Sequence, residues 1–311
     1  MTQGLASIIW PEIQSEARVT DRGRVAGSKA AGTVTLGELT VHRLGYGAMR
    51  LTGAGVWGPP KDRAGALAVL RRAVELGVNF IDTADSYGPD VSEELIAEAL
   101  SPYPKDLVIA TKGGWMRSGP GFWGHNATPE HLRKAVEGSL KRLRRERIDL
   151  YQLHIPDPIV SLEASVGTLA ELQSEGKIRL IGLSNVTREH IERARKVVPI
   201  VSVQNRYSFA DREWDYVVDY CERNGIVFVP WFPLGAGKAA QQAVQRVADS
   251  HGAKPMQVAL AWLLQRSPLM LPIPGTSSIE HLEENMLAGS LRLTEEELAE
   301  LAGVEELAFT R

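Results

Sequence analysis

One short stretch combines ionisable side chains with the pattern of a strand that is followed by a helix. Asp82 ends the apolar run at 78–82, and Tyr87 follows in a turn that ends on glycine. Tyrosine can transfer a proton, but its ordinary pKa of about 10 makes it a weak donor unless a cation stabilises the phenolate. Asp90 and Glu93 have the spacing of a capping box at the start of the next helix. The stretch therefore predicts chemistry at the carboxyl end of a strand.

Other polar side chains end apolar runs further along the chain. Lys112 and His154 each hold such a position. Alone, a lysine is usually a solvated charge, and a histidine usually has a structural role. In a closed barrel, however, the carboxyl ends of the strands converge, so both could contact Asp82 and Tyr87. Lys112 would then lower the pKa of Tyr87, Asp82 would keep the ammonium charged, and His154 would orient a substrate carbonyl or share the proton.

The elements that must position these residues alternate regularly. A short hairpin is predicted at 33–42, and a capping box at 294–297 starts a terminal helix. Between them, apolar runs alternate with amphipathic helices, whose starts are marked by residues such as Asp62, Thr128 and Thr187. This order predicts an α/β protein, a (β/α)8 TIM barrel with an N-terminal β-hairpin and a C-terminal extra helix. The expected strands are 44–47, 78–82, 107–111, 148–154, 180–184, 200–204, 226–230 and 270–274.

The domain organisation expected from the sequence is simple. Residues 1–32 read as a poorly specified N-terminal extension, and 33–311 as a single barrel domain, because no Pro/Gly/Ser-rich linker divides the chain. The net charge of −3 does not indicate a nucleic-acid or membrane partner. The basic run at 141–147 is interpreted as the charged end of a helix.

The composition also bears on compartment. No apolar run approaches the roughly 18 residues that a membrane span needs, and the first residues lack a secretory apolar core. Cys221 is the only cysteine, so an intrachain disulfide is excluded. It lies in a predicted helix, where a structural role is expected. These features predict a cytoplasmic protein.

Several motifs, taken in order, resemble the aldo-keto reductase superfamily from about residue 32 to residue 308. The resemblance implies a catalytic tetrad of Asp82, Tyr87, Lys112 and His154, with Tyr87 as general acid in carbonyl reduction by hydride transfer. The motifs are Asp-Thr-Ala-Asp-Ser-Tyr-Gly (82–88), Thr-Lys (111–112), Asp-Leu-Tyr-Gln-Leu-His (149–154), Gly-Leu-Ser-Asn (182–185), Val-Gln-Asn (203–205), Pro-Leu-Gly (233–235) and Ile-Pro-Gly-Thr (273–276).

The same resemblance implies a nicotinamide cofactor. We expect NADPH rather than NADH, although Gly275 and His281 stand where many members carry Lys and Arg for the 2′-phosphate. Thr276, Ser277 and the amino end of the following helix could still bind that phosphate. The G-x-G-x-x-A pattern at 235–240 follows the seventh strand, so we interpret it as a barrel cofactor loop and not as a Rossmann site. The implied contacts are Ser184, Asn185 and Gln204 at the carboxamide, Trp231 on the nicotinamide face, Leu234, Gly235 and Gly237 around the pyrophosphate, and Gly275, Thr276, Ser277, His281, Glu284 and Asn285 at the adenosine end.

Aromatic residues mark the expected substrate side. Trp57, Trp115 and Trp123 lie in long loops after the first and third strands, and suit a flat, mainly apolar substrate. Packing of these loops against one another is an equal alternative. Tyr207 and Phe209, after the sixth strand, are similar candidates.

Further distinctive stretches are Arg-Leu-Gly-Tyr-Gly-Ala-Met (43–49), Gly-Pro-Pro (58–60), Phe-Pro-Leu-Gly (232–235), the run at 255–268 and Ile-Pro-Gly-Thr-Ser-Ser (273–278). They resemble a bacterial branch of the superfamily that contains pyridoxal reductases. This narrower resemblance makes pyridoxal, a flat aromatic aldehyde, the leading substrate, with other aromatic or aliphatic aldehydes or ketones next. A nucleotide-sensing regulatory subunit without turnover is the alternative from another class. No metal is expected, because His154 has no partner at ligand spacing. The sequence leaves the oligomeric state and the favoured direction open.

Overall fold

A curved parallel sheet forms the centre of the protein. The computed structural model describes residues 27–232 and 238–304. Seven strands pair in parallel in the order β3-β4-β5-β8-β9-β10-β11, and each pair of neighbours keeps the same direction. Their bounds are β3 Tyr46–Gly47, β4 Phe80–Asp82, β5 Val108–Gly113, β8 Ile148–Leu153, β9 Ile178–Ser184, β10 Ser202–Gln204 and β11 Val227–Phe228.

The expected eighth strand is not a regular strand, although it closes the barrel. Leu271 donates its N–H to the carbonyl of Phe228 in β11 at 2.9 Å. On the other side, the carbonyls of Pro272 and Pro274 accept from the N–H groups of residues 45 and 47, next to and within β3, at 2.9 and 3.3 Å. Proline has no N–H, so half of the ladder on that side is missing. The predicted strand at 270–274 is therefore wrong as a strand, but right as the closing segment.

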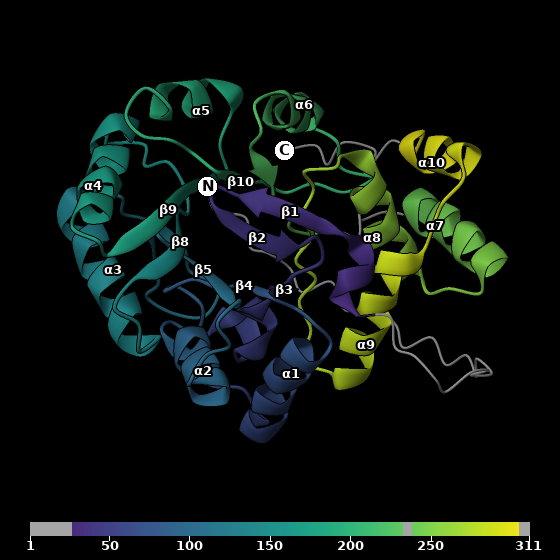
Figure 1. Cartoon of the computed structure of the whole chain (residues 1–311), viewed down its shortest axis with the longest axis horizontal. Helices are drawn as coiled ribbons and strands as arrows, with labels where there is room; N and C mark the ends of the chain where they lie inside the picture. Colours follow the sequence, from purple (N-terminus) through teal and green to yellow (C-terminus); the bar gives the residue numbers. More distant parts are fainter. Residues whose placement is uncertain (1–26, 233–237, 305–311) are drawn as a thin grey trace.

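Helices surround this sheet, as Figure 1 shows. Asp62, Thr128 and Thr187 accept hydrogen bonds from the first turns of α1, α3 and α5, which confirms the predicted caps. Their bounds are α1 Arg63–Glu75, α2 Val91–Leu100, α3 Pro129–Arg142, α4 Leu162–Ser174, α5 Arg188–Ala194, α6 Asp215–Arg223, α7 Lys238–His251, α8 Pro255–Arg266, α9 Ile279–Leu287 and α10 Glu295–Ala302. α10 confirms the expected terminal helix, and its capping box is formed by Thr294 and Glu297.

The capping box predicted for α2 is wrong. Asp90 precedes the helix with a φ of 70°, and its side chain makes no cap hydrogen bond. Its carboxylate instead lies 3.1 Å from the guanidinium of Arg142 in α3. Glu93 is fully buried, and it accepts from Arg142 Nε at 2.7 Å and from the Thr111 hydroxyl at 2.5 Å. These two carboxylates therefore anchor α2 to α3 and β5.

A β-hairpin closes the amino end of the barrel. Strands β1 (Thr33–Leu36) and β2 (Leu39–His42) pair antiparallel, as predicted, and lie across the sheet in the foreground of Figure 1. Their buried side chains, including Leu36 and Val41, pack with Phe80 of β4 and neighbouring strand residues. The short 3-10 turn Ser28–Ala31 precedes the hairpin, and its Ser28 hydroxyl donates to the Leu44 carbonyl at 2.5 Å. The predicted boundary between extension and barrel after residue 32 stays a prediction.

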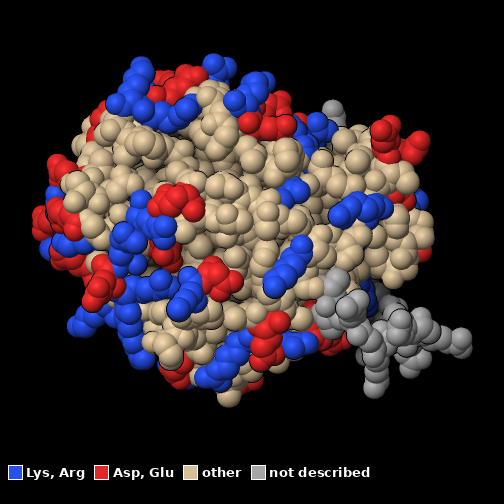
Figure 2. All heavy atoms as spheres, viewed as in Figure 1, with Lys and Arg blue, Asp and Glu red and all other residues tan. Residues whose placement is uncertain are grey.

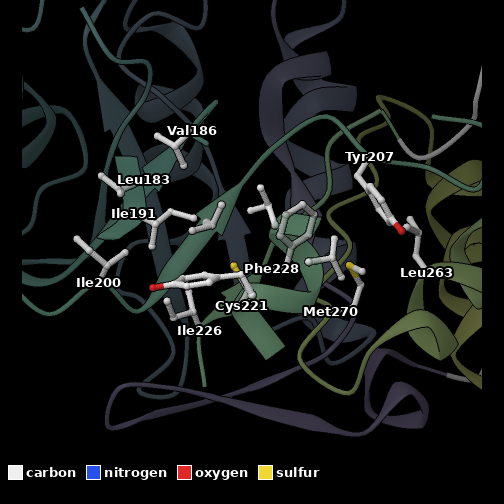
Figure 3. Close-up of a cluster of buried hydrophobic side chains, with 14 of the residues drawn as sticks. Leu183, Val186, Ile191, Ile200, Tyr207, Cys221, Ile226, Phe228, Leu263 and Met270 are labelled. Carbon is white, nitrogen blue, oxygen red and sulfur yellow. The ribbon is translucent and has the colours of Figure 1, made fainter. Parts of the chain in front are cut away.

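The largest hydrophobic cluster lies between the sheet and α3 to α8. Tyr207, Phe228 and Cys221 belong to it, and Figure 3 shows them among aliphatic side chains. Cys221 is buried in α6, as expected for a structural cysteine. Tyr207 and Phe209 are almost fully buried and pack against Trp262, so the suggestion that they face the substrate is wrong.

The surface carries many charges of both signs. Figure 2 shows Lys and Arg interspersed with Asp and Glu over one face. Several of them form ion pairs, such as Arg193 with Glu163 at 2.8 Å. Within the described ranges, no helix is both long and apolar enough to cross a membrane. The same residues contain no group of three or more His, Cys, Asp or Glu that could hold a metal ion.

Candidate active site

A buried ion pair lies at the carboxyl ends of the neighbouring strands β4 and β5. Lys112 Nζ is 2.6 Å from Asp82 Oδ1 and donates to the Thr83 carbonyl at 2.8 Å. The two side chains are only 0% and 3% exposed. Gln204 donates from Nε2 to the other Asp82 oxygen at 2.9 Å. Because both carboxylate oxygens and the ammonium are hydrogen-bonded, the pair has a fixed geometry.

Tyr87 lies against this pair. Its loop follows β4, and the Lys112 ammonium is 5.2 Å from the centroid of the phenol ring. The ring also meets His154, just after β8, edge to face with centroids 5.8 Å apart. The structure thus brings Asp82, Tyr87, Lys112 and His154 together, as the sequence predicted. Their catalytic roles stay predictions.

The pKa of Tyr87 differs from the expectation. Burial raises it above its ordinary value, and the charges of Lys112 and Asp82 act in opposite directions, Lys112 lowering it and Asp82 raising it. Lys112 therefore lowers the pKa of Tyr87 as predicted, but burial outweighs this effect and the net pKa is raised. The lysine offsets only part of the penalty of placing a phenolate in a dry site. Tyr87 therefore keeps its proton at neutral pH.

His154 is neutral in this environment. Burial and then the nearby Lys112 ammonium hold its pKa well below the ordinary value. Its Nδ1 is 3.5 Å from the Ser86 hydroxyl, and its backbone N–H donates to Gly113 at 2.9 Å. A neutral imidazole carries one N–H donor and no charge. Of the two roles left open by the sequence, this environment favours orientation of a carbonyl over storage of an extra proton.

The carboxyl ends of β9 and β10 add amide and hydroxyl groups. Asn185 has a φ of 57°, and its Nδ2 donates to the Ser184 hydroxyl at 3.1 Å and to the His154 carbonyl at 3.0 Å. Gln204 is buried between Asp82 and Gln152, so both hydrogens of its amide are used. Trp231 leaves 37% of its surface exposed. The Ser184 hydroxyl and the Asn185 carbonyl suit a carboxamide group, and the indole offers an open flat face.

The other expected cofactor residues gather around the start of α9. Thr276 is almost buried and its hydroxyl accepts from the N–H of Ser278, the N-cap residue. Ser277 and His281 are exposed beside it, and Glu284 and Asn285 follow one turn later. Gly275 is exposed and packs tightly on the β3 end, since a Cβ there would lie 2.7 Å from the Gly47 carbonyl. The remaining expected contacts, Leu234, Gly235 and Gly237, lie outside the described residues.

The aromatic loops lie next to the four central side chains. Trp115 begins the small antiparallel pair β6 (Trp115–Met116) and β7 (Gly124–His125), and its ring is 6.3 Å from that of His154. Trp115 also contacts Trp123 edge to face at 5.7 Å. Trp57 reaches the same region through a bridge to Gly88. Trp115 therefore packs against a neighbouring loop residue, as one alternative expected, and also lies beside His154. Contact of Trp57, Trp115 and Trp123 with a substrate stays a prediction.

Two functional neighbours were missed by the sequence interpretation. Gln152 accepts from Gln204 at 3.2 Å and donates to Ser202 at 3.2 Å, and so supports Gln204 from behind. The period of two along β8 places it on the same face as His154, a signal that could have found it. Arg117, which joins the aromatic loops, carries no comparable signal, because it lies in an irregular turn.

These features define a class of protein. A closed α/β barrel places a protonated phenol, a buried ammonium and a neutral imidazole at the carboxyl ends of its strands, where barrel enzymes carry their active sites. A sequence model of the Aldo/keto reductase family matches residues 43–306. The chain belongs to the aldo/keto reductase family, whose members are oxidoreductases that interconvert carbonyls and alcohols.

Individual relatives agree with this assignment. Pyridoxine 4-dehydrogenase of Escherichia coli K12 is 49% identical over 282 residues, which cover 88% of this chain and 99% of the relative. An uncharacterized oxidoreductase of Schizosaccharomyces pombe is 48% identical over 273 residues, covering 87% and 89%. The crystal structure of an aldo-keto reductase from Klebsiella pneumoniae in complex with NADPH has a TM-score of 0.76 at 26% identity, covering 90% of this chain and 97% of that one.

Proposed function

We propose that this protein is an NADPH-dependent reductase of aldehydes, with pyridoxal as the leading substrate, and that it acts in the cytoplasm. One observation carries the reaction type: the Tyr87 ring packs on the ammonium of Lys112, which is itself paired with Asp82 at 2.6 Å. Such a set is built to release a proton from a phenol and to stabilise the phenolate that remains. The single buried cysteine is consistent with the compartment.

Each side chain has a distinct part in this proposal. His154 is neutral and donates a hydrogen bond that orients the substrate carbonyl toward Tyr87. The Tyr87 O–H bond breaks as its proton forms a bond to the carbonyl oxygen, and Lys112 stabilises the phenolate. Asp82 keeps Lys112 charged and in place. NADPH, when bound, supplies the hydride that completes the reduction.

The cofactor's carboxamide is assigned to Ser184 and Asn185. The side-chain amide of Asn185 is only half used. Its NH₂ group donates to Ser184 and His154, while its oxygen Oδ1 makes no hydrogen bond within the described residues. An acceptor and a hydroxyl therefore remain for an amide. Trp231 covers one face of the nicotinamide ring in this assignment. Gln204 acts mainly through Asp82, because its amide hydrogens are already bonded.

A cation for the 2′-phosphate of NADPH is offered by Arg50. Its Cγ lies 3.5 Å from the position that a Cβ on Gly275 would occupy, so the arginine extends over the segment where the adenosine end is expected. Arg50 is exposed, and it makes no ion pair within the described part of the chain. An arginine is well suited to bind phosphate by charge and by its fork of N–H donors.

Replacing Arg50 with methionine is expected to weaken binding of NADPH by about 10- to 100-fold, the worth of a hydrogen bond to a charged group. Binding of NADH should change little, because NADH lacks the 2′-phosphate. Titration calorimetry with both dinucleotides, without any substrate, measures this directly. Arg63→Met is the control, since Arg63 is paired with Glu98 on the outer helices. Equal weakening of both cofactors would remove Arg50 from phosphate recognition.

The substrate proposal rests on the aromatic side chains near His154 and on the likeness to pyridoxine 4-dehydrogenase. Oxidation of NADPH should be observed with pyridoxal, and more slowly with benzaldehyde and short aliphatic aldehydes. The measurement is nicotinamide absorbance, compared between NADPH and NADH. Turnover of other aldehydes without pyridoxal would keep the reductase and discard the substrate. Tight cofactor binding with no turnover on the whole panel would instead indicate the nucleotide-sensing alternative.

A further inference from the structure

Arg117 ties three separate loops together at the barrel mouth. Within its own hairpin, Nε donates to the Phe122 carbonyl at 2.8 Å. Across to the loop after β3, Nη2 donates to Gly55 at 2.8 Å and Nη1 to Val56 at 3.0 Å. Nη1 also donates to the Ser86 carbonyl at 3.1 Å, next to Tyr87. One guanidinium therefore joins the loop after β3, the loop after β4 and the β6–β7 hairpin.

The same guanidinium holds two of the aromatic side chains. Its Cζ lies 3.7 Å from the centroid of the Trp123 ring and 5.7 Å from that of Trp57. Trp123 in turn meets Trp115, which contacts His154. Arg117 therefore sits behind a row of aromatic rings that starts at the imidazole. Its fork of donors and its flat π surface are both used, and a lysine could not reproduce them.

The conformation of the loop after β3 depends on these hydrogen bonds from Arg117. Gly55 has a φ of 68°, and Val56 has a φ of 55°, an unusual value for a β-branched residue. Backbone of this kind persists only where surrounding contacts fix it. The Val56 carbonyl accepts from Arg117 and from the N–H of Gly88 at 3.3 Å, and the Gly55 carbonyl accepts from Arg117 and from residue 121. Loss of Arg117 removes a fixed partner from both carbonyls.

We infer that Arg117 is a positioning residue that sets selectivity for large, flat aldehydes. It fixes Trp57 and Trp123 as one wall of the substrate site, so a substrate that extends to this wall depends on it. This inference rests on the proposed reductase function. Tyr87 itself has independent support, because its N–H donates to Ala84 at 3.2 Å and its phenol packs on Lys112. A small aldehyde that contacts only the central side chains should therefore be affected little.

Kinetics of Arg117→Met and Arg117→Lys test the inference. Both variants should raise KM for pyridoxal by about tenfold or more, as expected when a binding wall is misplaced, with a smaller change in kcat. For propanal, kcat/KM should stay close to that of the natural protein, and the Kd for NADPH should not change. Arg246→Met is the matched control, because Arg246 is an exposed arginine of α7 that pairs with Glu300.

Parallel losses for pyridoxal and propanal, or a lysine variant that behaves like the natural protein, would overturn the inference. Hydrogen exchange separates this result from failure of the proposed function. If the natural protein reduces no aldehyde, the reductase proposal fails by itself. The positioning of the loops by Arg117 is then tested by amide hydrogen exchange alone. The Arg117 variants should then exchange faster at 54–58 and 118–123, with 240–251 unchanged. Unaltered exchange in those loops would show that Arg117 does not position them.

Discussion

Replacing Tyr87 with phenylalanine is expected to lower kcat for aldehyde reduction by about 10²- to 10⁴-fold, the usual contribution of a positioned general acid. The ring would keep its contacts with Lys112 and His154, and only the hydroxyl would be lost. Binding of NADPH should therefore remain. Steady-state kinetics with pyridoxal and a cofactor titration give both quantities. A phenylalanine variant with nearly normal turnover would exclude Tyr87 as the proton donor.

Tyr151→Phe provides a matched control. Tyr151 is also fully buried in the barrel, but its hydroxyl has no hydrogen-bond partner within the described residues. Removing this hydroxyl should leave the reduction rate nearly unchanged. A large loss in both variants would point to a general sensitivity to buried hydroxyl groups and not to a specific donor.

The pH profile of the natural protein supplies a second control for Tyr87. The raised pKa of Tyr87 keeps the phenol protonated up to and above its ordinary pKa of about 10. The depressed pKa of His154 keeps the imidazole neutral down to and below its ordinary pKa of about 6.5. Reduction should therefore vary little between these limits and fall only at higher pH, where Tyr87 loses its proton. The residual rate of the phenylalanine variant should lack this alkaline fall.

Lys112→Met is expected to abolish most activity and to lower the free energy of unfolding by about 3–5 kcal/mol, as found when one partner of a buried ion pair is removed. Methionine has a similar length but no charge. Within the described residues, the buried Asp82 carboxylate would then keep only its hydrogen bond from Gln204. The phenolate would also lose its stabilising cation. Denaturant unfolding measures the first effect, and kinetics with pyridoxal the second.

The double variant Asp82→Asn with Lys112→Met distinguishes the two effects. Both charges are then absent, so much of the lost stability should return, because no uncompensated ion remains. Activity should not return, since Tyr87 would still lack the ammonium. Recovery of turnover together with stability would show that Lys112 acts only in folding.

Much of this site could be predicted because barrel geometry does most of the positioning. Asp82, Lys112 and His154 lie at or just after the carboxyl ends of three successive strands in the sheet, β4, β5 and β8, so the strand pattern alone brings them to one mouth. The types of side chain then indicate proton transfer. Local sequence patterns also placed the caps of α1, α3 and α5 and the terminal helix correctly, since these depend on neighbours in the sequence.

What the sequence did not reveal depends on burial and on irregular backbone. The sign of the Tyr87 pKa shift is decided by the balance between desolvation and the Lys112 charge, which no residue pattern contains. Arg117 binds carbonyls of backbone, and any residue offers a carbonyl, so the sequence names no partner for it. Asp90 satisfied the spacing of a cap, but the nearby Arg142 holds its carboxylate elsewhere.

The seam between the closing segment and β3 limits how this chain can vary. A Cβ on Gly47 would lie 2.6 Å from the carbonyl of Ile273, and one on Gly275 would lie 2.7 Å from the carbonyl of Gly47. This contact therefore requires glycine at positions 47 and 275, where a side chain would clash. It tolerates proline at 272 and 274, where no N–H group is needed. Natural drift or laboratory evolution toward new substrates is therefore freer in the aromatic loops than along this segment, although none of the four central side chains belongs to it.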